Sequence, residues 1–457
     1  MLASIPSAIV LGVDGQAVTV EVHVGIGLPG LTIVGLPDAA CREARDRVRA
    51  AVMAAGVAGP AKRITINLAP SGTRKMGSGL DLAMAVGVLV ANEDLTQEQV
   101  QGLGFLGELG LDGTVRPVPG IVPLVDAVEC GAVVVAVAAA PDALLVEGPK
   151  VRPVQTLSEL FHVLRGDEPW TDHALSRVCV AQDMPLDLAD VRGQPVVRRA
   201  LEVAAAGGHH LLLVGPPGAG KTMLASRLPG LLPDLGRNEA MEATRVHSAA
   251  GRTLRGGLVT RPPYRAPHHT ATMVALVGGG TEAMRPGEVS MAHAGVLFLD
   301  ELAEFAPVVL DALRQPLEEG VIRVSRARFT ARLPARVLLV AAMNPCPCGE
   351  AGRPGACRCP ESVLARYRRR LSGPLLDRFD LRVDVLRPEV DELLGSERGE
   401  PTATVAERVA EARDRAVLRG VRSNAELAGP DLDQWAPLAP DARDLLATVL
   451  RAGRLSA

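Results

Sequence analysis

One glycine-rich segment has residue types and spacing that suit phosphate binding, Gly215-Pro-Pro-Gly-Ala-Gly-Lys-Thr222. Glycines let backbone N–H groups approach phosphate oxygens closely, and a helix that starts after such a loop adds a favourable dipole. The run His210-Leu-Leu-Leu-Val214 before it predicts a buried strand, and the run from Met223 to Leu228 after it predicts a helix. Strand, loop and helix in this order are typical of a P-loop rather than of a glycine-rich turn with a chance lysine. The predicted phosphate contacts are Gly215, Pro216, Pro217, Gly218, Ala219, Gly220 and Lys221, and the predicted Mg²⁺ ligand is Thr222.

A second segment, Val296-Leu-Phe-Leu-Asp-Glu301, places two carboxylates after an apolar run. A buried parallel strand of this kind delivers side chains at its carboxyl edge, where nucleotides bind in such sheets. We expect Asp300 to help hold Mg²⁺ and Glu301 to accept a proton from the attacking water. An ordinary strand end with solvated acids is the alternative, which the phosphate loop disfavours.

Two further residues fit the chemistry of ATP hydrolysis. Asn344 follows the predicted strand Val337–Met343, and a neutral amide there can orient water without competing for Mg²⁺, which resembles the position called sensor 1 in AAA+ ATPases. Arg378 resembles the arginine that AAA+ subunits insert into a neighbour's nucleotide site, because its charge is permanent and its fork matches phosphoryl oxygens. The alternative is a surface salt bridge to Asp377 or Asp380. The first interpretation requires an oligomeric ring.

The composition sets the class of protein. A chain of 457 residues is too long for one core, so we expect two or three domains. A net charge of -3 excludes a globally basic nucleic-acid coat, and 2% aromatic residues argue against stacked-base binding, which leaves contacts to backbone phosphates. The sequence shows neither a signal peptide at Met1–Val10 nor an apolar run long enough for a bilayer. We therefore expect no membrane association and a cytoplasmic, reducing location, where the seven cysteines are thiols or metal ligands.

The elements that must position these residues are of α/β type. Residues 1–165 alternate β-rich runs (Ala17–Val24, Arg63–Leu68, Ala132–Val137) with helical segments (Ala39–Ala55, Leu80–Ala91). Residues 166–190 read as a polar linker, 191–385 as a second α/β unit with a parallel sheet, and 386–457 as helical, with helices predicted at Thr402–Leu418 and Asp441–Leu450.

Several longer sequence motifs resemble those of the magnesium-chelatase branch of AAA+ ATPases. They are Tyr264-Arg-Ala-Pro-His-His-Thr270, Gly278-Gly-Gly280, Pro286-Gly-Glu288 and Ala292–Glu301. Leu313-Arg-Gln-Pro-Leu-Glu318 and Met343-Asn-Pro-Cys-Pro-Cys-Gly349 narrow the resemblance to the ComM/YifB family over nearly the whole chain. The resemblance implies a hexameric, ATP-dependent DNA helicase that drives branch migration during recombination, notably when transformed DNA is integrated.

The same resemblance implies two segments that point toward the pore of the ring. One is an insert at about 264–290 and the other a β-hairpin at about 321–333. The candidate DNA contacts on the hairpin are Arg323, Arg326, Arg328 and Arg332. The alternative is a solvated hairpin with scattered charges. For His268 and His269 we favour a loop-shaping role over metal binding, because adjacent histidines do not by themselves make a site.

Four cysteines cluster in the loop 345–360, as Cys346-Pro-Cys348 and Cys357-Arg-Cys359. Four thiolates in a compact loop suit a closed, structural zinc site, although these pairs are tighter than the usual CxxC and free thiols are the alternative. Cys41, Cys130 and Cys179 are isolated and read as small apolar residues.

The N-terminal 165 residues resemble a Lon-protease-type, ribosomal S5-like domain, through segments such as Asn67–Ser71 and Gly77–Leu82. Lon-type peptidases activate a serine with a desolvated lysine, but the stretch after Gly107–Gly120 reads Ile121-Val-Pro123 without a lysine, and Ser78 lies only near the nucleophile's place. We expect a structural collar that offers DNA a path instead of peptidase activity. Arg63, Arg74 and Lys75 are candidate backbone contacts, with solvated charges as the alternative.

Two other functions remain as alternatives. A magnesium-chelatase motor subunit would use the same ATPase chemistry, but the Lon-like domain and the cysteine loop disfavour it. An ATP-dependent protease is opposed by the missing lysine. The resemblance also leads us to expect an arginine (sensor 2) in the C-terminal helical lid shortly beyond Leu455-Ser-Ala457, where this sequence stops, so we expect the lid in this chain to be truncated.

Overall fold

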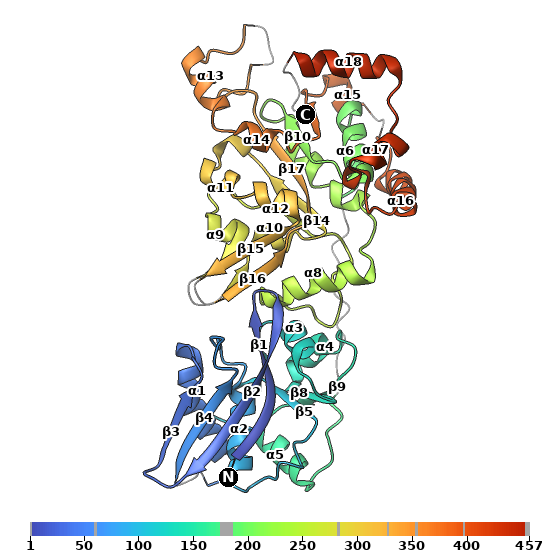
Figure 1. Cartoon of the computed structure of the whole chain (residues 1–457). Helices are drawn as coiled ribbons and strands as arrows, with labels where there is room; N and C mark the ends of the chain where they lie inside the picture. The colour runs from blue at the N-terminus through green and yellow to red at the C-terminus, as the bar shows by residue number, and fades with distance from the viewer. Residues whose placement is uncertain are drawn as a thin grey trace.

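The computed structural model describes residues 2–58, 62–173, 186–280, 284–326, 329–351, 355–395 and 398–452. An N-terminal unit, residues 2–173, lies at one end of the molecule (Figure 1). A central unit, residues 186–385, adjoins it, and the C-terminal helices lie at the opposite end of the molecule.

The N-terminal unit is built on a four-stranded sheet in the order β1-β2-β4-β3. Its strands are β1 (Leu2–Leu11), β2 (Asp14–Gly25), β4 (Arg63–Ala69) and β3 (Gly30–Val34). In β2, valines at alternate positions point into the core, so one face of the sheet is apolar. Helices α1 (Ala39–Ala54) and α2 (Asp81–Ala91) pack there, and every residue of α2 is buried because protein surrounds this helix.

A smaller sheet completes this unit. Its strands run parallel, and they are β5 (Leu103–Leu106), β8 (Ala132–Ala136) and β9 (Lys150–Val154). A short ladder joins β6 (Glu108–Leu109) to β7 (Val115–Arg116). The accompanying helices are α3 (Ile121–Ala127), α4 (Ala140–Ala143) and α5 (Leu157–Arg165), the last of which begins at a Thr156 side-chain cap.

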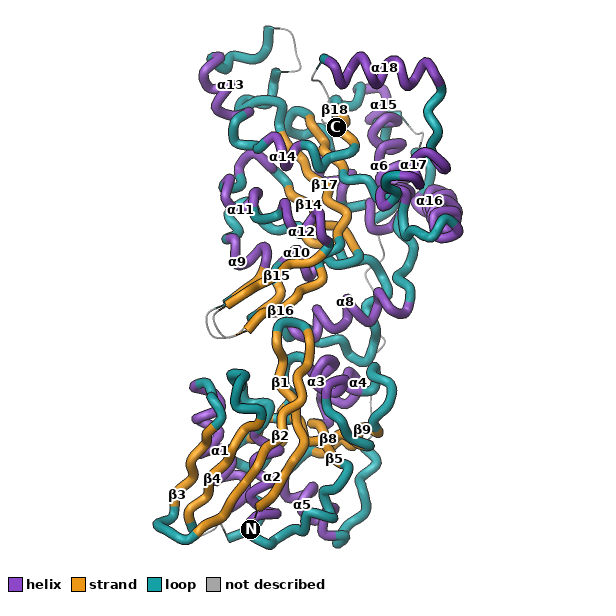
Figure 2. The backbone as a smooth tube through the Cα atoms, viewed as in Figure 1, coloured by secondary structure: helices purple, strands orange, loops and turns teal. Residues whose placement is uncertain are grey.

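The central unit is organised by a five-stranded parallel sheet in the order β11-β14-β17-β10-β18 (Figure 2). The strands are β11 (Tyr264–Arg265), β14 (Gly295–Leu299), β17 (Val337–Met343), β10 (Leu211–Val214) and β18 (Leu381–Asp384). Val296 and Phe298 belong to the core on one face, whereas Leu297 and Leu299 belong to the core on the other. Burial on both faces explains why these strands are continuous apolar runs.

Helices cover both faces of this sheet. One core includes α6 (Pro195–Gly207), α7 (Lys221–Ala225) and α16 (Thr402–Leu418). The other includes residues of α8 (Arg237–Ala249), α9 (Met273–Val277), α10 (Glu288–Met291), α11 (Pro307–Asp311) and α14 (Gly373–Leu376). Short connecting elements are β12 (Gly278–Gly279), β13 (Arg285–Pro286), α12 (Arg314–Glu319) and α13 (Glu361–Arg368). The remaining C-terminal helices are α15 (Val390–Leu394), α17 (Pro430–Trp435) and α18 (Pro440–Arg451).

A hairpin of β15 (Val321–Arg326) and β16 (Phe329–Pro334) extends from the central unit toward the N-terminal unit (Figure 1). The turn between β1 and β2 reaches it there. Val13 at that turn is buried in the same core as Ala331 and Leu333 of β16. A Cβ on Gly12 would lie 3.0 Å from the Ala331 Cβ, so the two hairpins are in direct contact.

Polar contacts fasten the two units beside this apolar contact. Ser248 of α8 accepts the Gly120 N–H at its carbonyl (2.9 Å) and the Val122 N–H at its hydroxyl (3.2 Å). Asp142 accepts the N–H groups of Leu254 (3.2 Å) and Gly256 (2.7 Å). These bonds use backbone donors of loops and helix starts, which fixes the N-terminal unit in one orientation.

The α/β architecture, the parallel central sheet and the helical C-terminal region confirm the coarse fold prediction. β1 is not among the strands that the sequence predicts, because Ser4, Pro6 and Ser7 interrupt its apolar pattern; the proline is tolerated because β1 is an edge strand. The helix predicted after the phosphate loop is α7, which begins two residues earlier than expected, at Lys221, and ends at Ala225, and Pro229 lies in a 3₁₀ turn beyond it. Among the described residues no helix is both long and apolar enough to cross a membrane.

We predict that Val13→Asp separates the two hairpins. A carboxylate at this buried position loses its hydration without gaining a partner cation, which costs several kcal/mol. Hydrogen exchange of the β16 amides should rise about tenfold or more, while exchange in β10 and β17 stays unchanged. Leu2→Asp, at the exposed end of the same strand pair, is the matched control. Unaltered exchange in β16 of the Val13 variant would refute this contact.

Candidate functional site

Three predicted site residues meet at one edge of the central sheet. β10 pairs in parallel with β17, and β17 pairs in parallel with β14. The carboxyl ends of these neighbouring strands are followed by Gly215, Asn344 and Asp300. The sheet order therefore assembles the phosphate loop, the acidic pair and the amide that the sequence predicts as separate segments.

The phosphate loop, residues 215–220, is held in shape by close backbone packing. The Gly215 N–H donates to the Met343 carbonyl at 3.1 Å, and a Cβ on Gly215 would lie 2.2 Å from the Val385 carbonyl oxygen. Gly218 and Gly220 have φ of 76° and 87°, in the left-handed region that favours glycine. Pro216 is half-buried, Pro217 is exposed and Ala219 is buried. α7 begins directly after Gly220, so its first N–H groups face the loop.

Lys221 is drawn into the loop by three acceptors. Its Nζ donates to the carbonyls of Gly215 (2.7 Å) and Pro216 (3.0 Å) and to Oδ1 of Asn344 (3.1 Å). Burial lowers the pKa of Lys221, and the charges of Asp300 and Glu301 act in the opposite direction. The ammonium is thus positioned over the loop and linked to the predicted sensor amide.

The carboxylate of Asp300 contacts both Thr222, which follows the phosphate loop, and its neighbour Glu301. The Thr222 hydroxyl donates to Oδ2 of Asp300 at 2.6 Å, and the Glu301 N–H donates to Oδ1 at 2.9 Å. Glu301 has a φ of 51°, which is uncommon for a residue with a side chain. Its carboxylate is more than half exposed.

His269 is a contact of Glu301 that the sequence interpretation missed. Its Nδ1 lies 3.2 Å from Oε2 of Glu301, and its ring meets Phe305 edge-on with centroids 6.5 Å apart. The His268 ring lies 4.1 Å from the His269 ring, and the Thr270 N–H donates to the His268 Nδ1 at 3.3 Å. His268 fits the loop-shaping prediction, whereas His269 reaches the acidic pair. The signal for His269 is the parallel pairing of β11, which shortly precedes it in the chain, with β14, which ends at the acidic pair. Only the fold reveals this pairing.

The residues at this edge fit a nucleoside triphosphate with Mg²⁺. The loop and the start of α7 offer backbone N–H donors, and Lys221 offers an ammonium, which together suit phosphate oxygens. Thr222 and Asp300 offer the adjacent hydroxyl and carboxylate oxygens that Mg²⁺ prefers.

Arg378 lies at the opposite edge of the same sheet. Leu381, which begins β18, donates its N–H to the carbonyl of His210, just before β10, at 3.0 Å. Arg378 therefore sits near the amino ends of the strands, remote from its own phosphate loop. Its guanidinium donates to Glu318 of α12, so its salt bridge is with Glu318 and not with Asp377 or Asp380.

The hairpin arginines fall into two groups. Arg323 and Arg332 are exposed and directly opposite one another in the β15–β16 register. Arg323 pairs with Glu319 at 3.1 Å, and Arg332 is close enough for its charge to act on Asp14, whose pKa is raised mainly by burial. Arg326 ends β15 with a side chain outside the described residues, and Arg328 lies outside them entirely.

The four predicted zinc ligands converge. Sγ of Cys346 lies 3.2 Å from that of Cys348, and Cys357 Sγ lies 3.8 Å from both. All four sulfur atoms, that of Cys359 included, lie within 4.8 Å of one another. Backbone and thiol hydrogen bonds, first that of the Glu350 N–H, lower the pKa of Cys348 to about 6. This geometry gives the described parts of the cysteine loop, residues 345–351 and 355–360, the ligand set of a closed metal site.

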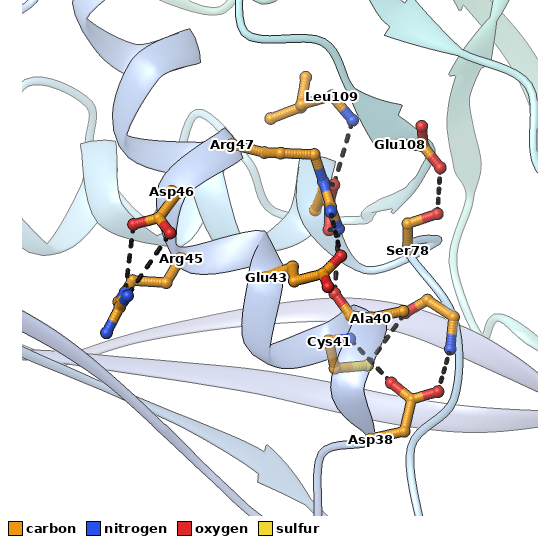
Figure 3. A network of polar contacts seen from close by, with 12 residues as sticks. Asp38, Ala40, Cys41, Glu43, Arg45, Asp46, Arg47, Ser78, Glu108 and Leu109 are labelled. Atoms are coloured by element: carbon orange, nitrogen blue, oxygen red, sulfur yellow. Dashed lines mark hydrogen bonds and ion pairs between the residues drawn. The ribbon is translucent and has the colours of Figure 1, made fainter. Parts of the chain in front are cut away.

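Figure 3 shows a group of polar contacts in the N-terminal unit that includes the pair of Ser78 and Glu108. The Ser78 hydroxyl donates to the Glu108 carboxylate. Nearby, Arg47 Nε donates to Asp81 Oδ2 at 2.6 Å, and burial raises the pKa of Asp81 to about 6 against the opposing effect of Arg47. Lys75 is fully buried and donates to the Pro70 carbonyl, so its prediction as a surface DNA contact is wrong.

Family profiles match this chain in three segments. "Magnesium chelatase, subunit ChlI" matches residues 187–393, "Subunit ChlI of Mg-chelatase" matches 20–138, and "Magnesium chelatase, subunit ChlI C-terminal" matches 399–457. Among curated proteins, Rv2897c of Mycobacterium tuberculosis is 49% identical over 98% of this chain and 90% of its own length. YifB of Escherichia coli is 44% identical over 97% of this chain and 88% of its own length. The competence protein ComM of Haemophilus influenzae is 44% identical over 95% of this chain and 86% of its own length.

The chain belongs to the ComM/YifB family of magnesium-chelatase-like ATPases. The family resemblance predicted from the sequence is therefore confirmed. The central sheet and its phosphate-loop edge belong to the AAA ATPase domain of ChlI type, which implies ATP hydrolysis.

We predict that His269→Ala lowers kcat for ATP hydrolysis about tenfold and leaves KM for ATP nearly unchanged, because it frees the carboxylate of Glu301 from its oriented position. His269→Asn places an amide donor near the position of Nδ1 and should recover most of the rate. His162→Ala, a histidine of the N-terminal unit, is the control. Equal rates for the His269 variants and the native protein would contradict a positioning role.

Proposed function

We propose that this protein is a ring-forming, ATP-driven DNA motor, a branch-migration helicase that acts in homologous recombination and natural transformation. The observation that carries the ATP part is the single sheet edge that joins Lys221, Asp300 and Asn344. The DNA part rests on the family, which includes the competence protein ComM, and on a basic hairpin face.

In the proposed reaction the chain's own residues bind and orient. Gly218, Gly220 and the first residues of α7 offer backbone N–H groups to the phosphates, and Lys221 exchanges its carbonyl partners for β- and γ-phosphate oxygens. Thr222 and Asp300 would hold Mg²⁺, which would supply positive charge beside the phosphates. Glu301 accepts a proton from the attacking water, and Asn344 orients that water. Lys221 and Asn344 already share a hydrogen bond, so both are positioned together.

A ring explains the place of Arg378. Because this guanidinium lies at the sheet edge opposite to its own phosphate loop, it can complete a nucleotide site only in a neighbouring subunit. We therefore propose a homo-oligomer, a hexamer as in the family prediction, in which Arg378 leaves Glu318 and reaches the neighbour's γ-phosphate.

The hairpin supports a polyanionic partner. Arg323 and Arg332 lie opposite each other across β15 and β16 on the exposed face, where Arg323 pairs with Glu319 and the charge of Arg332 acts on Asp14. Both guanidinium groups can exchange these carboxylates for DNA phosphates, and such contacts carry no sequence preference, as a motor that tracks a strand requires. The opposite hairpin face packs on Val13, so only the arginine face remains for DNA.

Other functions receive less support. A Lon-like, S5-like fold for the N-terminal unit is part of our proposal, but Ser78 has a carboxylate partner and not the lysine amine of a Lon-type dyad, which opposes a protease. A chelatase motor subunit shares the family profiles, but YifB and ComM align with nearly the whole chain. The proposed cofactors are ATP with Mg²⁺, and Zn²⁺ at Cys346, Cys348, Cys357 and Cys359.

We predict that forked or four-way DNA stimulates ATP hydrolysis by this protein and that Lys221→Ala abolishes it. Arg323→Ala with Arg332→Ala should weaken DNA binding and reduce the slope of log affinity against log salt by about 2, because each arginine neutralises one phosphate. The control removes two exposed arginines from the C-terminal helices, Arg415 and Arg443. ATP hydrolysis that responds to neither DNA would refute the helicase while leaving the ATPase intact.

We further predict that Arg378→Ala lowers kcat at least about a thousandfold and leaves ATP binding intact, because the finger acts on the transition state. Mixing this variant with Glu301→Gln subunits should restore part of the rate. In mixed rings the Glu301→Gln subunit donates its arginine to the complete acidic edge of its neighbour. Each variant alone is the control. Mixtures no more active than the variants alone would contradict catalysis between subunits.

A further inference from the structure

The cysteine loop packs against the phosphate loop. A Cβ on Gly349 would lie 2.4 Å from Cδ of Pro217, so the two backbones approach as closely as only glycine allows. Gly349 has a φ of 81°, and its N–H donates to the Cys346 carbonyl at 2.9 Å. The residue that touches Pro217 is thus fixed by the same turn that carries the cysteines.

Two more contacts connect this region to the nucleotide site. Arg387 donates to Oε1 of Glu350 at 3.1 Å and to the Pro217 carbonyl at 3.5 Å, so it bridges the cysteine loop and the phosphate loop. Tyr367 of α13, which follows the cysteine loop, donates its hydroxyl to the Asn344 carbonyl at 3.0 Å. The cysteine loop therefore adjoins both Pro217 and Asn344.

The four sulfurs are grouped closely enough for one zinc ion, since all lie within 4.8 Å of one another. Four sulfurs at about 2.3 Å from a central zinc in a tetrahedron are separated by about 3.8 Å from one another. The distances from Cys357 to Cys346 and Cys348 have this value, whereas Cys346 and Cys348 lie closer, at 3.2 Å. Cys346 is buried while the other three are partly or fully exposed, which leaves access for the metal and a fixed anchor on the protein side.

We propose that Zn²⁺ bound by Cys346, Cys348, Cys357 and Cys359 holds Gly349 against Pro217 and thereby pre-forms the phosphate loop for ATP. The inference rests on the proposed function, since it assigns the zinc to the affinity of that same nucleotide site. Without the metal, the cysteine loop gains conformational freedom, and so does the phosphate loop that packs against it. ATP must then order the phosphate loop as it binds, which lowers the net affinity for ATP. The zinc takes no part in the hydrolysis chemistry.

The test compares zinc content and ATP affinity in the full chain. Zinc is measured by atomic emission, and the dissociation constant is measured with a fluorescent ATP analogue in excess Mg²⁺. The native protein should contain about one zinc per chain. Cys357→Ser with Cys359→Ser should contain none and bind ATP about tenfold more weakly. Cys130→Ser, which removes a thiol from the N-terminal unit, should match the native protein in both measurements.

The variant Arg387→Ala keeps the zinc site and weakens the contact between the cysteine loop and the phosphate loop. This variant keeps all four cysteines, so it should retain its zinc yet bind ATP about threefold more weakly, because the bridge from Glu350 to Pro217 is lost. It also keeps the inference testable if the double cysteine variant fails to fold.

The outcomes distinguish the two proposals. A native protein that binds ATP but holds no zinc overturns the inference alone, as does zinc loss without any change in ATP affinity, or an Arg387 variant with unchanged ATP affinity. A native protein that holds zinc but binds no ATP refutes the proposed ATPase and the inference with it.

Discussion

The parallel pairing of β10 with β17 and of β17 with β14 is the constraint on which the rest of the structure depends. The carboxyl ends of parallel strands lie at the same edge of a sheet. Residues more than a hundred positions apart therefore come together there although no sequence motif connects them. The hydrogen bond from Lys221 to Asn344 crosses this edge, and the bond from Thr222 to Asp300 connects α7 to β14. Apolar burial on both sheet faces holds the strands in this register.

The same constraint connects the nucleotide edge to the other end of the molecule. β16 ends at Pro334 and β17 begins at Val337, so the chain that packs on Val13 continues directly into the strand that positions Asn344. A buried contact at one end of this segment and a hydrogen bond to Lys221 at the other give the N-terminal unit a continuous physical link to the ATP site.

The sequence predicted local elements well where the pattern is strong. The apolar run 337–343, the alternating valines near Ala17–Val24 and the helical spacing at Thr402–Leu418 all became the expected elements. The sequence did not predict β1, because polar residues and a proline interrupt its apolar pattern. The bounds of α7 differ from the expected ones because the loop glycines set its start and Pro229 lies beyond its end. The sequence also misjudged Lys75, since a lysine near a loop tip usually stays solvated and this one is buried.

The sequence by itself determined the family and the chemical identity of the nucleotide edge, because glycines, a lysine, a threonine and paired carboxylates in that order suit only a narrow range of chemistry. Only the tertiary structure decided what stands beside those residues. It brought His269 to Glu301, Gly349 to Pro217 and Val13 to the β16 hairpin, and it paired Arg378 with Glu318. These contacts join segments far apart in the chain, and strand order and side-chain packing, which local pattern does not encode, select them.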